Sequence, residues 1–219
     1  MSFPIRARTI ALGAGAVIAL TACASNPVHY YTLVSPAATT MATAAAATAR
    51  AAAPLAINVL PIGIPAQLDQ QQMVVRSGTG RAVILDNERW VAPLGDELRA
   101  ALSSALVEQL GAHNVTGLPR PSNQTVMSIR TQVRRFDAWP GRMAQFEADW
   151  AVGVQQDTPG MPGTPGTRIS CSTRLNEAIP GSYADMVRVQ QRMIEQFAAR
   201  VASTVRSVGS GRAACPADS

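Results

Sequence analysis

The sequence contains no lysine, only two histidines and only three cysteines. Every basic residue is therefore an arginine, and these arginines form no clustered basic stripe of the kind that binds nucleic acid. The formal net charge of +5 is also too small to indicate such a partner. We interpret the arginine-only composition, together with the abundant alanine, as a consequence of genome composition, and we expect no nucleic acid among the partners.

The scarcity of histidine also argues against catalysis. His29 lies close to the N-terminus and His113 lies just after a predicted helix, so neither is placed beside an evident nucleophile. The sequence contains no Gly-x-Ser-x-Gly, His-Glu-x-x-His or phosphate-binding glycine motif, and its cysteines and histidines lack the close spacing of zinc ligands. We therefore expect a protein that is not an enzyme, with no catalytic residue, no metal site and no dissociable cofactor.

Long apolar runs are missing as well, because no run reaches the roughly twenty residues that span a bilayer. The apolar segment 10–20 is only about eleven residues long and follows Arg6 and Arg8, as in a secretory signal peptide. It ends in Leu20-Thr21-Ala22-Cys23, which resembles at all four positions the lipobox of bacterial lipoproteins. We expect residues 1–22 to be a lipoprotein signal peptide. The alternative is an ordinary secretory signal with a chance cysteine near its cleavage site.

In a lipoprotein of this pattern, Cys23 becomes the first residue and carries a diacylglyceryl thioether and an acylated α-amine. Two buried acyl chains already anchor a protein stably, so three chains, with palmitate among them, make detachment negligible. The next residue is Ala24 rather than Asp, the usual inner-membrane retention signal of enterobacterial lipoproteins. We therefore expect lipidation at Cys23 and anchoring at the periplasmic face of the outer membrane.

Lipidation of Cys23 leaves Cys171 and Cys215 as an even pair in an oxidising compartment. A disulfide between them is the leading hypothesis, and in the chain-entropy model it would contribute about 4 kcal/mol. The alternative is two unrelated thiols, with Cys171 buried and Cys215 on a frayed end.

The chain after Cys23 begins with a short tether. Residues 23–29 reach at most about 25 Å when fully extended, so the folded domain must lie close to its membrane. Residues 29–34 favour a strand through their aromatic and β-branched side chains, and residues 55–64 favour a buried strand. Between them, residues 35–54 are an expected insertion, rich in alanine and threonine, with little that builds a core.

A hairpin and a helix follow. Residues 73–76 and 81–85 flank Ser77-Gly78-Thr79-Gly80, whose glycines suit a turn between antiparallel strands. A helix is expected to begin close to Pro93 and end at Gly111, since leucines recur every four residues along one face. The other face carries polar residues that we expect in water, namely Glu97, Arg99, Ser103 and Glu108.

Two long strands are expected in the C-terminal half, over residues 125–139 and 143–155 around the turn dipeptide Pro140-Gly141. In the first strand, strict alternation assigns Arg130 to the polar face. The same alternation assigns Arg135 to the more apolar face, which we expect to point inward.

A proline- and glycine-rich hairpin tip over residues 157–166 precedes a strand expected over residues 167–175. The last helix is expected to begin at Ser182, which is spaced for a capping box with Asp185. Its apolar stripe recurs mostly every four residues and consists of Met186, Val189, Met193, Phe197, Val201 and Val205.

These elements predict an α+β fold in which two amphipathic helices pack on one face of a largely antiparallel sheet. We expect a single domain over residues 30–208 and a C-terminal tail over residues 209–219. The sheet face opposite the helices is then available for a partner.

Three motifs resemble the PqiC-type ABC-transport auxiliary lipoproteins associated with MCE lipid-transport systems. They are the opening strand Tyr30-Tyr31-Thr32-Leu33, the segment 62–76 with Leu68-Asp69 and a strand ending in Arg76, and the Trp90-containing entry to the leucine-rich helix. The resemblance covers about half of the chain, up to Leu110, whereas the C-terminal half matches in layout.

Two positions depart from the family pattern. Gln67 stands where the family often has tyrosine, and Gln71 where it often has proline. These departures concern the loop before the hairpin and leave the Trp90 region intact.

The resemblance implies a non-enzymatic component of an intermembrane lipid-transport system. It implies docking of an MCE-domain tunnel protein, and of that protein's inner-membrane partner, at the outer membrane, with the ATPase on another polypeptide. By analogy we expect self-association into a homo-oligomer. The alternative is a structural envelope lipoprotein that supports an outer-membrane or cell-wall assembly.

The motifs single out Tyr30, Tyr31, Asp69, Arg76 and Trp90 as candidate partner-interface residues. Each also has a structural interpretation. Asp69 would order a turn, Arg76 would pair with an acid, and Trp90 would fill the gap between helix and sheet.

Overall fold

The computed structural model describes residues 26–36, 55–119, 124–155 and 165–216. The predicted signal peptide 1–22, Cys23, most of the predicted insertion 35–54 and most of the predicted hairpin tip 157–166 therefore lie outside the described residues. Within the described ranges, no helix combines the length and apolar character that crossing a membrane requires.

The described chain contains helices and strands in the α+β arrangement that the sequence predicts. Their order is β1 (His29–Tyr31), β2 (Ala56–Val59), η1 (Ala66–Leu68), β3 (Gln72–Ser77), β4 (Arg81–Trp90), α3 (Leu94–Leu110), β5 (His113–Asn114), β6 (Val126–Trp139), β7 (Met143–Gln155), β8 (Pro165–Ala178) and α4 (Tyr183–Gly209).

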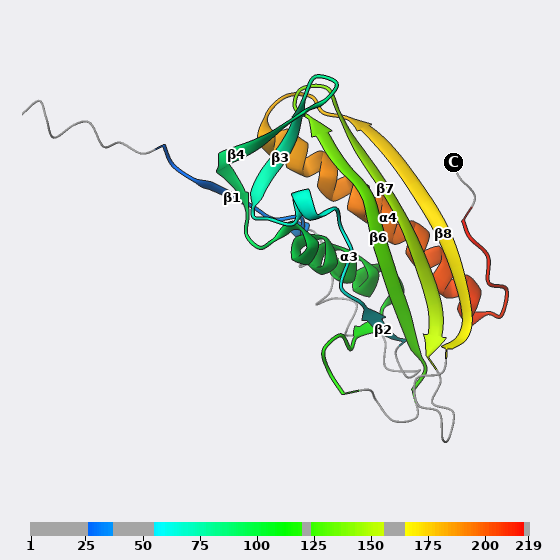
Figure 1. The fold of residues 1–219 in the computed structure, drawn as a ribbon. Helices are drawn as coiled ribbons and strands as arrows, with labels where there is room; N and C mark the ends of the chain where they lie inside the picture. The colour runs from blue at the N-terminus through cyan, green and yellow to red at the C-terminus, as the bar shows by residue number, and fades with distance from the viewer. Residues whose placement is uncertain (1–25, 37–54, 120–123, 156–164, 217–219) are drawn as a thin grey trace, which may run out of the picture.

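The larger of two sheets has the strand order β5-β2-β6-β7-β8. Strands β6, β7 and β8 are antiparallel, whereas β2 is parallel to both β5 and β6. Figure 1 shows α4 running along β6 to β8 on one face, with α3 beside it. The core lies in this layer, where Phe197 of α4 packs against Phe146 and Trp150 of β7 at ring-centroid distances of 5.0 and 6.0 Å.

A second sheet has the order β1-β4-β3, in addition to the single sheet that the sequence predicts. β3 and β4 form the expected antiparallel hairpin, whereas β1 pairs in parallel with β4 and places Tyr31 beside Trp90. Local pattern does not specify this pairing, since the two strands are distant in sequence.

Two strands are shorter than predicted. β1 ends at Tyr31, although Leu33 is buried. β2 ends at Val59, close to Pro61, which lacks an N–H for ladder pairing. After Val59, the Leu60 amide still donates to the Ile129 carbonyl at 3.0 Å, and an isolated bridge joins Gly63 to Gln132 of β6.

The prediction that Arg135 points inward is wrong. The pairing of β6 with β7 contains a β-bulge between Val133 and Arg135, which shifts the alternation by one residue. Arg135 is consequently exposed, and Phe136 takes the inward place. Arg130, before the bulge, is exposed as predicted.

Helix α3 follows Pro93 and ends at Gly111, which adopts a left-handed conformation with φ of 58°. Four leucines of its stripe are buried as predicted, namely Leu94, Leu98, Leu102 and Leu106, whereas Leu110 at the end of the helix is half-buried. The expectation that Glu97 faces water is wrong. Glu97 is 5% exposed, and its carboxylate accepts hydrogen bonds from the Thr32 hydroxyl and the Leu33 amide, both at 2.8 Å. These two donors satisfy a carboxylate that would otherwise be costly to bury.

Helix α4 begins with the predicted capping box. The Ser182 hydroxyl accepts from the Asp185 amide, and the Asp185 carboxylate accepts from the Ser182 amide. All six residues of the predicted apolar stripe are buried against the sheet.

The C-terminal tail folds back from α4 along the edge strand β8. Cys171 and Cys215, the candidate pair, form a disulfide. The Ser207 hydroxyl also binds the tail, accepting from the Ala214 amide at 3.2 Å. The tail therefore covers part of an edge strand that would otherwise expose unpaired backbone groups.

Replacing Trp90 by alanine should lower the free energy of unfolding by about 3 to 5 kcal/mol, because the indole is 3% exposed and its loss leaves a cavity. Trp139→Ala is the matched control, since Trp139 is only half-buried and its indole donates to the Gly78 carbonyl at 3.1 Å. We expect a smaller loss there. Urea unfolding followed by circular dichroism measures both. A loss of about 0.5 kcal/mol or less for Trp90→Ala, with weakened partner binding, would instead assign Trp90 to an interface.

Candidate interaction surface

The motif residues gather around the start of α3, with the exception of Arg76. Tyr31 pairs with Trp90 across β1 and β4, and the Trp90 amide donates to the Gln71 carbonyl at 2.7 Å. The deep burial of Trp90 supports its interpretation as a packing residue between helix and sheet. Tyr30 points the other way and is 60% exposed.

Asp69 lies at the end of η1, where its amide donates to the Ala66 carbonyl. Its carboxylate faces the first turn of α3 near Gly95, so close that a Cβ at Gly95 would lie 3.5 Å from Oδ1. A negative charge at a helix N-terminus is favourable, typically by about 0.3 to 1 kcal/mol. Asp69 thus lies in the turn before α3, and its carboxylate is placed to support the start of that helix.

Arg76 joins the two sheets. Its guanidinium Nε donates to Asp137 Oδ1 of β6 at 2.8 Å, and the Asp137 side chain is only 10% exposed. Arg76 therefore pairs with an acid, which is the structural role that the sequence predicts for it. The pair holds the β3–β4 hairpin against the large sheet. The partner was not identifiable from sequence, because Asp137 lies beyond the bulge that breaks the alternation.

A polar cluster lies beneath the outer face of β1. The Tyr31 hydroxyl donates to the Glu88 carboxylate, and His29 Nδ1 lies 3.0 Å from Glu88 Oε1. Burial of the phenol, this hydrogen bond and the nearby negative charge of Glu88 raise the pKa of Tyr31 to about 12. Tyr31 is therefore a neutral donor throughout the physiological range.

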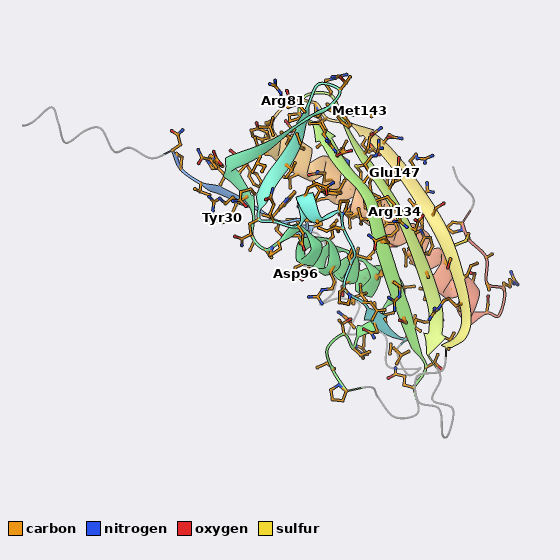
Figure 2. All side chains as sticks on the ribbon, in the orientation of Figure 1. Tyr30, Arg81, Asp96, Arg134, Met143 and Glu147 are labelled. Carbon is orange, nitrogen blue, oxygen red and sulfur yellow. A yellow bond between two sulfur atoms is a disulfide. The ribbon has the colours of Figure 1, made fainter. Side chains whose placement is uncertain are left out.

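The face of the large sheet opposite the helices carries cross-strand ion pairs. Arg134 Nε contacts Asp149 Oδ2 at 2.8 Å, and Arg174 Nε contacts Glu147 Oε1 at 3.0 Å. Figure 2 shows Arg134 and Glu147 on this face. Exposed pairs of this kind contribute only about 0.2 to 1 kcal/mol each, so their charges remain available to a partner.

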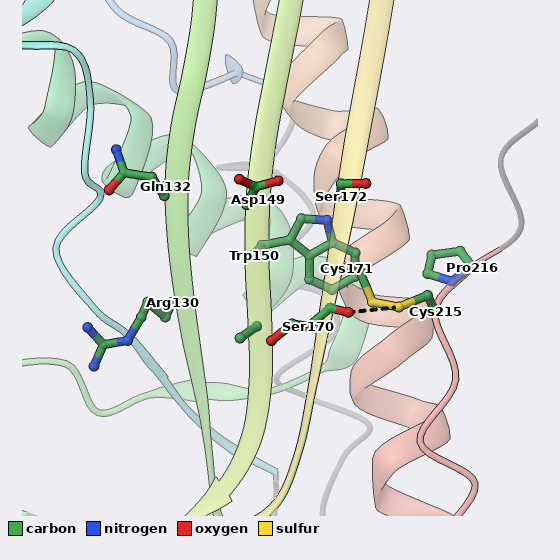
Figure 3. Close-up of a pocket in the computed structure, with 10 residues that line it drawn as sticks. Arg130, Gln132, Asp149, Trp150, Ser170, Cys171, Ser172, Cys215 and Pro216 are labelled. Atoms are coloured by element: carbon green, nitrogen blue, oxygen red, sulfur yellow. Dashed lines mark hydrogen bonds between the residues drawn. A yellow bond between two sulfur atoms is a disulfide. The ribbon is translucent and has the colours of Figure 1, made fainter.

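An open groove of about 560 Å³ crosses the same face toward the C-terminal tail. Figure 3 shows Arg130 and Gln132 at one side, Asp149 and Ser172 in the middle, and the disulfide of Cys171 and Cys215 at the other side. Arg130 was assigned to the polar face from sequence. The part of the groove that the C-terminal tail forms was not predictable from sequence, because it depends on how the chain returns along β8.

The two histidines lie in different sheets, His29 in β1 and His113 in β5. Among the residues that the structure describes, no three histidine, cysteine, aspartate or glutamate side chains are grouped so that they could hold a metal ion.

Tyr31 should ionise near pH 12, late for a tyrosine. Because its pKa is raised in the folded state, the stabilisation is complete below pH 10 and is lost as the pH rises from 10 to 12. Titration of phenolate absorbance, with circular dichroism as the control for folding, measures this. The late step should disappear in Tyr31→Phe and persist in Tyr30→Phe. Ionisation of all tyrosines together near pH 10 would contradict the assignment.

Solved structures show the same fold. An uncharacterized protein of known structure matches with a TM-score of 0.60 at 20% identity, over 82% of this chain and 99% of that one. A protein from Xanthomonas campestris matches with a TM-score of 0.50 at 12% identity, over 75% of this chain and 91% of that one. Curated protein sequences show no significant similarity to the chain.

The family model for the ABC-type transport auxiliary lipoprotein component matches residues 31–202. The match extends from β1 into α4, so it includes both sheets and the C-terminal half that the sequence motifs leave uncovered. The resemblance drawn from the sequence is confirmed: the chain belongs to the family of ABC-type transport auxiliary lipoprotein components.

Proposed function

We propose that this protein is a non-enzymatic lipoprotein, anchored in the outer membrane through Cys23, that docks the periplasmic tunnel protein of an MCE-type intermembrane lipid-transport system. The observation that carries the proposal is the family match over residues 31–202, immediately after a lipobox and a short tether. ATP hydrolysis belongs to another polypeptide of the system. The motifs between Tyr30 and Leu94 support the MCE association by resemblance.

The mechanical arrangement supports a docking role. A tether of at most about 25 Å between Cys23 and Tyr30 keeps the domain next to its membrane. The tether enters β1, and the Glu97 carboxylate holds the chain that leaves β1 on α3. The domain therefore cannot swing far from the anchor, and a partner that spans the periplasm must come to it.

The ion-paired face of the large sheet is the proposed docking face. The helices occupy the opposite face, so they leave Arg130, Arg134 and Asp149 accessible together. A surface with charges of both signs provides orientation and specificity more than affinity. Such a surface suits a partner that must bind in a single orientation above the membrane.

Cys23→Ser should abolish function while leaving the fold intact, since Cys23 precedes the described domain and removal of the lipid leaves its core unchanged. Crosslinking in cells followed by purification of tagged protein should recover the MCE-domain partner with the wild type and lose it with Cys23→Ser. Equal melting temperatures of the two purified proteins provide the control.

Full complementation by the unlipidated variant, or repeated failure to recover an MCE-domain protein with the wild type, would contradict the proposal. Recovery of a cell-wall or β-barrel assembly instead would favour the structural alternative.

Arg130→Glu should reduce recovery of the same partner, because it reverses a charge on the exposed sheet face without removing buried surface. Arg192→Glu is the matched control, since Arg192 is exposed on α4 at the opposite face. Quantitative immunoblotting of the crosslinked partner compares the two variants. Equal recovery with both, or a loss only with Arg192→Glu, would show that the sheet face is not the docking face.

A further inference from the structure

Exposed apolar side chains cluster where the tether meets the domain. Val28, Tyr30 and Val91 are 40%, 60% and 58% exposed. Among the described residues, the other large hydrophobic side chains with comparable exposure are Ile84 and Leu118. Three of these five therefore lie at β1 and its junction with β4.

Strand pairing places the three on one surface. Tyr31 and Trp90 are paired and face the interior, and the Val91 amide donates to the Tyr31 carbonyl at 2.9 Å. Because side chains alternate along a strand, Tyr30 and Val91 face outward together with Arg89, the residue paired with Tyr30. Val28 precedes Tyr30 by two residues and shares its side. We call Val28, Tyr30, Arg89 and Val91 the β1 face.

The length of chain before this face limits what can cover it. Five residue steps separate Cys23 from Val28, so the acylated cysteine lies within about 18 Å of Val28 even when the tether is fully extended. Figure 1 shows the chain entering β1 at one extremity of the fold. The β1 face is thus the described apolar surface with the shortest connection to the bilayer.

We propose that the β1 face rests on the membrane, with Tyr30 and Val91 in the headgroup region of the bilayer that holds the lipid on Cys23. The inference rests on the anchoring part of the proposed function and adds the surface and orientation of contact. In this arrangement the domain contacts the membrane directly and is not merely tethered to it.

The chemistry of the β1 face fits a lipid interface. Tyrosine is enriched at membrane surfaces, since its ring is apolar and its hydroxyl can remain hydrated. The two valines add apolar area. Arg89, the residue paired with Tyr30, adds a cation whose Nε donates to the Asp86 carbonyl at 3.0 Å, and anionic lipid headgroups attract such basic groups. This contact alone would bind a membrane only weakly. It becomes effective because the acyl anchor already holds the β1 face near the membrane surface.

The test uses the full lipidated chain in vesicles of phosphatidylethanolamine and phosphatidylglycerol. Val91→Cys and, as the matched control, Leu118→Cys are each labelled with an environment-sensitive maleimide dye without reduction of the disulfide. Leu118 is 65% exposed and follows β5, which pairs with β2 of the large sheet and not with β1. Mass spectrometry verifies lipidation of Cys23 before reconstitution.

We expect blue-shifted emission and quenching by brominated lipid at position 91, and neither at position 118. Adding Tyr30→Ser to Val91→Cys should reduce the quenching while lipidation is unchanged.

An unquenched label at position 91 in lipidated protein would overturn the inference and leave the anchoring intact, as would equal quenching at both positions. A label that is shielded only when the MCE-domain partner is added would overturn it in favour of a protein interface. Absence of lipid on Cys23 would instead refute the anchoring itself.

Discussion

The buried carboxylate of Glu97 is the contact on which the arrangement of the N-terminal region depends. It lies in the first half of α3 and accepts from the Thr32 hydroxyl and the Leu33 amide, so it fixes the chain directly after β1. With that chain fixed, β1 can pair with β4, and Leu33 is buried in the core. Charge-assisted hydrogen bonds in a buried site are strong, and loss of their donors would leave an uncompensated charge. The Glu97 carboxylate and the pairing of β1 with β4 therefore together fix the place where the tether meets the domain.

The two sheets act as one body because several different interactions cross between them. The Arg76–Asp137 pair connects the hairpin to β6, and the Trp139 indole donates to the Gly78 carbonyl at the adjacent hairpin tips. Trp90 fills the space near the start of α3. A lipoprotein with a short tether benefits from such rigidity, since the orientation of its membrane side then determines the orientation of every other surface. The ion-paired face and the β1 face are two surfaces of this single body.

The local features of the fold were predictable from the sequence, because neighbouring residues encode them. Strands β6 and β7 follow the predicted limits closely, because alternation over a long segment and a Pro-Gly turn leave few alternatives. The capping box of Ser182 and the left-handed Gly111 were also readable, since each depends on a few neighbouring residues. The same reasoning failed at Arg135, where a bulge inserted one residue, and at Glu97, where a distant segment supplied the donors. Both failures concern polar residues whose environment comes from another part of the chain.

By itself, the sequence predicts an export signal and a lipobox at Cys23, and it determined the fold class and the apolar faces of both helices, since these depend on short-range periodicity and motif spacing. Only the tertiary structure decided that β1 runs parallel to β4, that Glu97 is buried, that Asp137 is the partner of Arg76, and that Tyr30 and Val91 share an exposed face. Each of these features brings together residues that are distant along the chain. Their proximity results from burying one core and satisfying its polar groups together, and that condition applies to the whole fold rather than to any local segment.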